Sequence, residues 1–223
     1  MTPTQSSTRH DVDVRSSVVA ELEWTPGLDA AEIGVAVEHG AVTLTGKAAS
    51  YAERLRAEKA ALRVQGVIAV ADEIEVRLPG AAPDDSDVAR EAGEALDRAV
   101  DVPPEVTAVV RDGVVTVAGE VTWQFQRVAA ERAVQYLRGV VAVRNKVTLK
   151  PEAEAENVHR LINSALVRNA QLDSNRITVT SAPGGVITLR GTVQSWAERR
   201  QAERAAWAAP GVVTVVNELV LGS

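Results

Sequence analysis

Residues 113–119 read Gly-Val-Val-Thr-Val-Ala-Gly, and a third glycine, Gly139, follows twenty residues after the second. Valines on alternate positions between two glycines indicate a short strand that returns from a tight turn. The same glycine spacing, six residues and then twenty, occurs twice more, at Gly40, Gly46 and Gly66 and at Gly185, Gly191 and Gly211. The first glycines of the copies lie 73 and 72 residues apart, so the chain is an internal triplication.

An apolar triple at helical spacing precedes the glycines of every copy. The triples are Val14, Val18 and Leu22; Val88, Ala92 and Leu96; and Val158, Ile162 and Leu166. Positions four residues apart lie on one face of a helix, so each copy is expected to open with a helix. The candidate N-caps are Asp13, Asp87 and Asn157.

The rest of each copy predicts a hairpin, a second helix and a final strand. Alternating apolar residues lead into turns at His39-Gly40, at Asp112-Gly113 and at a longer tip ending in Gly184-Gly185. An alanine-rich helix follows, and Gly-Val-x-x-Val opens the last strand. The fold class is therefore α+β, with three tandem αββαβ modules, each a three-stranded mixed sheet with two helices on one face.

The repeat also predicts the domain boundaries. They are a disordered tail at 1–12, module 1 at 13–78, a linker at 79–85, module 2 at 86–149, a short linker at 150–155 and module 3 at 156–221. Modules of this size bury only about 60% of their unfolded surface, so packing between neighbours is expected.

Composition restricts the function classes. The chain of 223 residues has a net charge of −6 and no cysteine, which excludes a disulfide framework and a thiolate nucleophile. The interspersed charges disfavour nucleic acid as a partner. The first residues contain no apolar run of signal-peptide length, so the expected location is the cytoplasm.

The glycine-valine hairpin, the helix containing Ala-Glu-x-Ala and the final Gly-Val-x-x-Val-x-Asn together resemble the BON domain. The strongest local matches are residues 113–119 and Gly211-Val-Val-Thr-Val-Val-Asn217, and the resemblance covers the chain from about Asp13 to Leu221. It implies a bacterial, non-catalytic binding module associated with osmotic or envelope stress, with phospholipid surfaces or with protein partners. A cytoplasmic relative that carries one BON domain binds potassium.

The residues themselves do not form a catalytic constellation. The three histidines, His10, His39 and His159, occupy non-equivalent positions, so no repeated metal or acid–base site is built on histidine. A nucleophile elbow, a zinc-type His-Glu-x-x-His and an EF-hand loop are all absent from the sequence. We therefore expect no enzyme activity, no metal site and no cofactor.

Polar residues recur at one position of the last strand: Asp72, Asn145 and Asn217. Such a side chain most often bonds nearby backbone or bends the strand, and the alternative is a ligand site. Arginine and glutamate also recur four residues apart on the second helix, as in Arg54 and Glu58. That spacing suits an exposed ion pair, with a shared ligand site as the alternative.

Two sets of apolar residues are candidate contact surfaces. Trp24, Trp123 and Trp196 are candidates for membrane or partner contact, and Trp24 at a helix end is the strongest of them. Val212, Val216 and Val220 fall on alternate positions near the last strand of copy three. An apolar second face needs covering, so these valines are a candidate interface with another module or, in a homo-oligomer, another subunit.

These observations predict a stress-associated, non-catalytic binding protein whose three modules contact membrane phospholipid or protein partners. The alternative is a cytoplasmic protein that binds a small ligand or a monovalent cation such as potassium, with Asp72, Asn145 or Asn217 lining the site.

Overall fold

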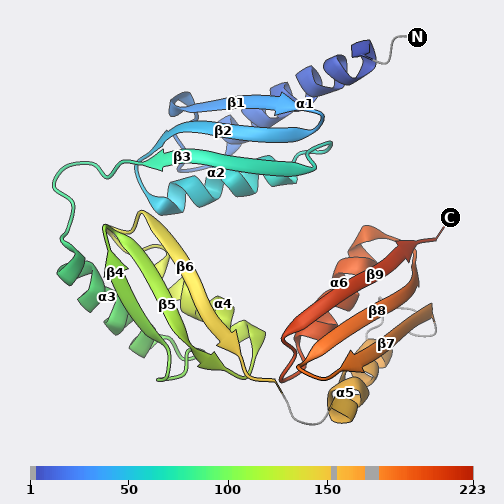
Figure 1. The fold of residues 1–223 in the computed structure, drawn as a ribbon. Coiled ribbons are helices and arrows are strands. Elements are labelled where there is room, and N and C mark those ends of the chain that lie inside the picture. The colour runs from blue at the N-terminus through green and yellow to red at the C-terminus, as the bar shows by residue number, and fades with distance from the viewer. Residues whose placement is uncertain (1–3, 152–154, 169–175, 223) are drawn as a thin grey trace. The chain divides into compact units, whose positions relative to one another are not determined.

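The computed structural model describes residues 4–151, 155–168 and 176–222, which form three αββαβ modules. Each module has one sheet of three strands, with the second strand in the centre. Two helices lie on the same side of each sheet (Figure 1). The predicted α+β class and the two-layer modules are confirmed.

Module 1 has an antiparallel hairpin and a parallel third strand, so its sheet is mixed. Leu44 at the centre of the middle strand pairs with Val35 on one side and with Asp72 on the other. The elements are α1 (Thr4–Trp24), a short 3₁₀ helix (Ala30–Glu32), β1 (Ile33–Glu38), β2 (Ala41–Ala48), α2 (Tyr51–Arg63) and β3 (Ala69–Val76).

Module 2 repeats this order of elements with strand order β4-β5-β6. Its elements are α3 (Asp85–Arg98), β4 (Thr107–Arg111), β5 (Val114–Val121), α4 (Gln124–Val134) and β6 (Ala142–Leu149).

Module 3 reproduces the register of module 1, because Leu189 pairs with Val179 and Asn217 as Leu44 pairs with Val35 and Asp72. Its elements are α5 (Ala155–Arg168), β7 (Ile177–Ala182), β8 (Val186–Val193), α6 (Trp196–Trp207) and β9 (Thr214–Leu221).

The core of each module lies between its helices and one face of its sheet. In module 1, Leu44 is fully buried and belongs to the same cluster as the apolar triple of α1 and the alanines of α2. Leu189 occupies the equivalent place in module 3. The small alanines let the second helix lie close to the sheet. The other sheet face carries no helix, and we call it the open face.

The glycines that reveal the repeat are required by close backbone approach. A Cβ atom on Gly46 would overlap the carbonyl oxygen of Glu32, the residue directly before β1. A Cβ atom on Gly40 or Gly113 would lie 2.8 Å from the carbonyl oxygen of Gly66 or Gly139, respectively. The first and third glycines of a copy therefore pack against each other, and the spacing is a consequence of the fold.

The ends of the first helices differ from the sequence-based expectation. Helix α1 begins at Thr4, so residues 4–12 are helical, although a tail at 1–12 was expected to be disordered. No proline or glycine interrupts that stretch, and Asp11 is held by the first hairpin. Asp13 and Asp87 lie inside their helices; in module 2 the N–H of Asp87 donates to the Asp84 carboxylate, which acts as the cap.

The third glycine of each copy has a left-handed backbone conformation, with φ of 92°, 92° and 71° at Gly66, Gly139 and Gly211. Helix α2 ends at Arg63 and Val64 caps it, so Gly66 lies beyond the helix in the following turn, with φ of 92°. Residues 1–3 of the predicted tail, residues 152–154 of the predicted second linker and the stretch 169–175 lie outside the described residues.

Candidate functional site

The recurrent polar residue of the last strand lies on the helix-covered face of the sheet. In all three copies its side-chain oxygen accepts the N–H group two residues ahead: Ile74 for Asp72, Val147 for Asn145 and Leu219 for Asn217. These distances are 3.1, 3.1 and 3.3 Å. The prediction that this residue bonds nearby backbone is confirmed.

The same residue also ties the last strand to the second helix. The Asn145 amide donates to the Arg127 carbonyl and to the Glu131 carboxylate, at 2.8 and 3.2 Å. The Asn217 amide makes the equivalent bond to Glu203 at 3.0 Å. The amide groups are therefore already engaged within their own modules.

Module 1 makes this link with a charge. Asp72 is an acid and cannot donate, and instead its carboxylate receives the Arg54 guanidinium, with Nε 2.8 Å from Oδ2. In module 3, Arg199 reaches the equivalent strand, β9, and donates to the carbonyl of Asn217 at 2.7 Å. Thus Arg54 and Arg199 bond the last strand, whereas the spacing alone had suggested exposed ion pairs along the helix.

A buried acid fixes the start of the second helix. The Glu53 carboxylate accepts the N–H groups of Asp29 and Ala49 at 2.8 and 2.6 Å, while Ser50 caps the helix through the Glu53 N–H. Ser195 and Glu198 repeat this capping in module 3. In module 2, Gln126 accepts from the N–H of Trp123. The Ser-x-x-Glu spacing is a signal for this cap that could have been read from the sequence.

A second acid joins the first helix to the hairpin tip. The Asp11 carboxylate accepts the N–H groups of His39 and Gly40 at 2.9 and 3.0 Å. Asp85 does the same for Asp112 and Gly113 in module 2. We call each arrangement the hairpin clamp. The N–H of His39 holds the pKa of Asp11 below its usual value, since it donates to the ionised form.

The hairpin clamp was missed in the sequence, although a signal exists. Both acids lie three residues before the first residue of the apolar triple, Val14 in module 1 and Val88 in module 2. The turns that they hold have positive φ at both central positions, 50° and 78° in the first hairpin. Such turns direct neighbouring N–H groups outward, where a carboxylate can accept them.

The structure exposes two of the three candidate tryptophans. Trp24 at the end of α1 is 84% exposed, and Trp196 at the start of α6 is 59% exposed. The Arg199 guanidinium lies 5.5 Å from the centre of the Trp196 ring, within the range of a cation–π contact. Trp123 is half-buried and its ring lies 6.0 Å from that of Phe125. Trp24, Trp123 and Trp196 belong to three different modules.

The candidate interface valines divide between two environments. Val216 and Val220 are 38% and 60% exposed on the open face of module 3, as expected. Val212 is buried in the core of module 3, because β9 begins only at Thr214 and the alternation of faces does not extend back through the turn. The exposed pair is therefore Val216 and Val220 without Val212.

The open faces of the three modules differ in charge. Module 2 presents four basic residues and one acid, a balance of +3: Arg111, Arg144, Lys146, Lys150 and Glu120. Module 1 presents three acids and two bases, a balance of −1: Glu38, Glu73, Glu75, Lys47 and Arg77. Module 3 presents Arg190 and Glu218, which form an ion pair and raise the pKa of Arg190.

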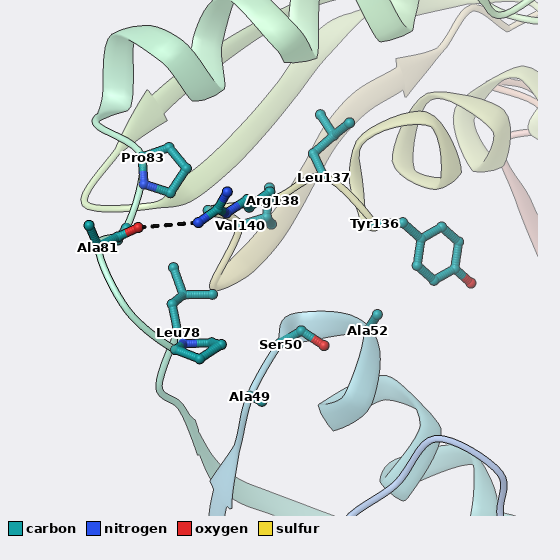
Figure 2. A pocket seen from close by; sticks show the side chains of 13 residues that line it. Ala49, Ser50, Ala52, Leu78, Ala81, Pro83, Tyr136, Leu137, Arg138 and Val140 are labelled. Carbon is teal, nitrogen blue, oxygen red and sulfur yellow. Dashed lines mark hydrogen bonds between the residues drawn. The ribbon is translucent and has the colours of Figure 1, made fainter.

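The linker before module 2 is held against that module. It lines a pocket, and Figure 2 shows Leu78, Ala81 and Pro83 with Arg138 and Val140. The Arg138 guanidinium donates to the carbonyl of Ala81 at 3.5 Å. A Cβ atom on Gly139 would lie 3.3 Å from Pro83, so the glycine leaves room for the proline ring.

The described part of the chain contains neither a cluster of metal-ligating side chains nor a membrane-spanning helix. No group of three or more histidine, aspartate or glutamate side chains there is placed to hold a metal ion. None of its helices has both the length and the apolar character of a membrane span.

Comparisons with known proteins agree with the internal repeat. The BON domain family matches the chain three times, over residues 10–77, 84–151 and 155–223. The osmotically-inducible protein Y of Escherichia coli (strain K12) is 30% identical over 148 residues, which are 63% of this chain and 73% of that protein.

Solved structures of CdsD, a structural protein of the type III secretion system of Chlamydia trachomatis, are also similar. A structure of its C-terminal domain is 16% identical, with 95% of this chain and 98% of that chain covered and a TM-score of 0.27. A second CdsD structure has the same identity and TM-score, with 94% and 92% covered. That TM-score is too low to inform either arrangement or function.

Proposed function

This chain belongs to the BON domain family, and from that premise we propose that it is a stress-associated, non-catalytic binding protein. Its modules would contact membrane phospholipid or protein partners through surfaces outside their shared cores. The association with stress is supported by its similarity to the osmotically-inducible protein Y.

The exposure of Trp24 is the observation that carries this proposal. The indole ring of Trp24 is 84% exposed, so a membrane or a partner that covers it would remove a large apolar surface from water. By contrast, the polar residues that recur in the copies already bond within their modules, as Asp72 bonds Arg54 and Asn217 bonds Glu203. No described contact favours the alternative of a small-ligand or monovalent-cation site at these residues.

Liposome flotation at physiological salt tests the membrane part of the proposal. We expect the protein to float with vesicles. The Trp24→Ala variant should bind vesicles at least about fivefold more weakly, since burying a large apolar side chain is worth on the order of 1–3 kcal/mol. Neutral and phosphatidylglycerol-containing vesicles are compared, because the net charge of −6 opposes anionic lipid.

Leu62→Ala is the matched control, since Leu62 is another large apolar residue that is 54% exposed on α2. A loss of flotation with Trp24→Ala alone assigns the contact to the end of α1. Equal losses with both variants would contradict a specific role for Trp24. Absence of flotation with either lipid would remove phospholipid from the proposal and leave a protein partner.

A further inference from the structure

Module 2 differs from its neighbours in having an open face that is basic. Four cations stand against one acid on this face, although the whole chain has a net charge of −6. We call it the basic face; its charged residues are Arg111, Glu120, Arg144, Lys146 and Lys150. All five side chains are exposed, whereas the opposite face of the same strands carries buried valines such as Val117 and Val147.

Within the described residues, the cations of the basic face form no ion pair, whereas one cation on the open face of each other module does. Arg77 of module 1 bonds Glu75 at 2.9 Å, and Arg190 of module 3 bonds Glu218. Within the residues that the structure describes, none of the ion pairs involves a cation of the basic face. Of the three open faces, that of module 2 therefore carries net positive charge, a balance of +3 against −1 and 0.

Three of the cations follow one edge of the sheet. Arg144 and Lys146 lie on β6, and Lys150 follows it with its N–H still bonded to the carbonyl of Val121 on β5. Strand β6 is the last strand of its sheet. Residues two apart on a strand lie about 6.7 Å apart on one face, so Arg144 and Lys146 are neighbours in a row, and Lys150 lies two such steps further on, beyond Thr148.

We infer that the basic face of module 2 docks an acidic polypeptide segment in extended conformation, which lies along β6. An added strand would use the backbone groups that an edge strand offers, and its own side chains would repeat with the same period as the cations. Directly opposed side chains on neighbouring strands have Cβ atoms about 5 Å apart, within reach of carboxylate–cation pairing. The occupant would thus carry acids at alternate positions.

An anionic membrane fits these features less well. Among the large apolar residues that are exposed in the described part of the chain, only Val109 lies on the basic face, so the face has little to insert into lipid. A membrane also does not require a fixed repeat between cations, whereas a strand does. The exposed Trp24 belongs to α1, outside module 2.

The inference rests on the proposed binding function and identifies one partner class for one module. Its test is fluorescence anisotropy of the full chain with two labelled peptides. One alternates glutamate and threonine over eight residues, and the other has the same composition with the four glutamates in one block. We expect the alternating peptide to bind about threefold or more tightly than the block peptide, and both to weaken with salt beyond roughly 0.1 M, where the Debye length is near 10 Å.

Charge reversal assigns the binding to the basic face. Arg144→Glu with Lys146→Glu is expected to weaken binding of the alternating peptide by about tenfold or more. The matched control reverses Arg132 on α4 and Lys59 on α2, two exposed cations outside the basic face, and changes the net charge equally. The control should change affinity less than about twofold, since neither cation lies on the basic face and salt screens charges that are not in contact.

Several results would overturn the inference. The alternating peptide could fail to show saturable binding up to about 1 mM, a concentration that corresponds to weak affinity. The two peptides could bind with equal affinity, or the two double variants could weaken binding equally. The Arg144 and Lys146 reversal could instead abolish flotation with phosphatidylglycerol vesicles and leave peptide binding unchanged. That result would assign the basic face to lipid. Flotation without any peptide binding would contradict this inference but would still agree with the proposed function.

Discussion

At the scale of single residues, the glycine spacing records where two backbones meet. Gly46 has φ of 114°, and a side chain there would overlap the carbonyl oxygen of Glu32. Gly119 repeats the approach, since a Cβ atom would lie 2.7 Å from the carbonyl oxygen of Glu105. Function therefore need not be invoked to explain why these positions recur.

Gly46→Ala is expected to destabilise module 1 by about 3 kcal/mol or more, because steric overlap at a packed site adds to the strain of a positive φ. Gly80→Ala is the control: Gly80 has φ of 72°, but nothing lies within 4 Å of its added Cβ atom. Its cost should stay near about 1 kcal/mol, that of the left-handed conformation. Hydrogen exchange of residues 33–48 measures the difference, and similar protection in both variants would contradict the steric account.

The roles of individual polar residues were only partly predictable. Bonding of Asp72, Asn145 and Asn217 to the backbone follows from their short side chains, a local property. The partner of Arg54 could not be predicted, because Asp72 lies 18 residues away and reaches Arg54 only when β3 packs beneath α2. Sequence spacing along one helix cannot report a contact that the sheet creates.

At the scale of elements, the hairpin clamp joins α1 to the β1–β2 turn. The ionised Asp11 accepts both N–H groups of the turn, so its pKa in the folded chain is depressed below the usual aspartate value. The clamp is complete above the unfolded pKa of about 3.9 and is lost as pH falls through the lower folded value. Acid should therefore release the hairpin tip.

An NMR titration of the His39 and Gly40 amide resonances tests this linkage. We expect both resonances to move together with a midpoint below about 3.9, the unperturbed aspartate value. Asp11→Ala should abolish the movement and speed exchange of the two amides. Asp13→Ala is the control, since Asp13 lies in the same helix and the Asp11 carboxylate is the one that bonds the turn. A titration that survives Asp11→Ala would refute the clamp.

The elements themselves were largely predictable, and their ends were not. The triple of Val14, Val18 and Leu22 predicts a helix, and all three residues are buried. That helix nevertheless begins at Thr4, because a polar stretch without proline extends it at little cost. Val212 was placed on the wrong face because the strand begins two residues later than the alternation suggested. Boundaries depend on tertiary contacts that periodicity does not contain.

At the scale of the whole molecule, the copies agree inside and differ outside. Leu44 and Leu189 occupy equivalent buried positions, whereas the open faces carry charge balances of −1, +3 and 0 in chain order. Repetition in sequence shows the shared core, and the surfaces that distinguish the modules are the ones able to select different partners. The basic face could have been identified from the sequence by comparing alternate positions on the strands.

The separate cores lead to a prediction about how the chain responds to damage. The cluster around Leu44 contains only residues 14–74, and the cluster around Leu189 only residues 158–219, among the described residues. Truncating either leucine to alanine should cost about 2–5 kcal/mol, the range for buried leucine. The loss of hydrogen-exchange protection should stay within module 1 for Leu44→Ala and within module 3 for Leu189→Ala. Each variant serves as the control of the other, and loss of protection in both modules from one substitution would show that the chain unfolds as a single unit.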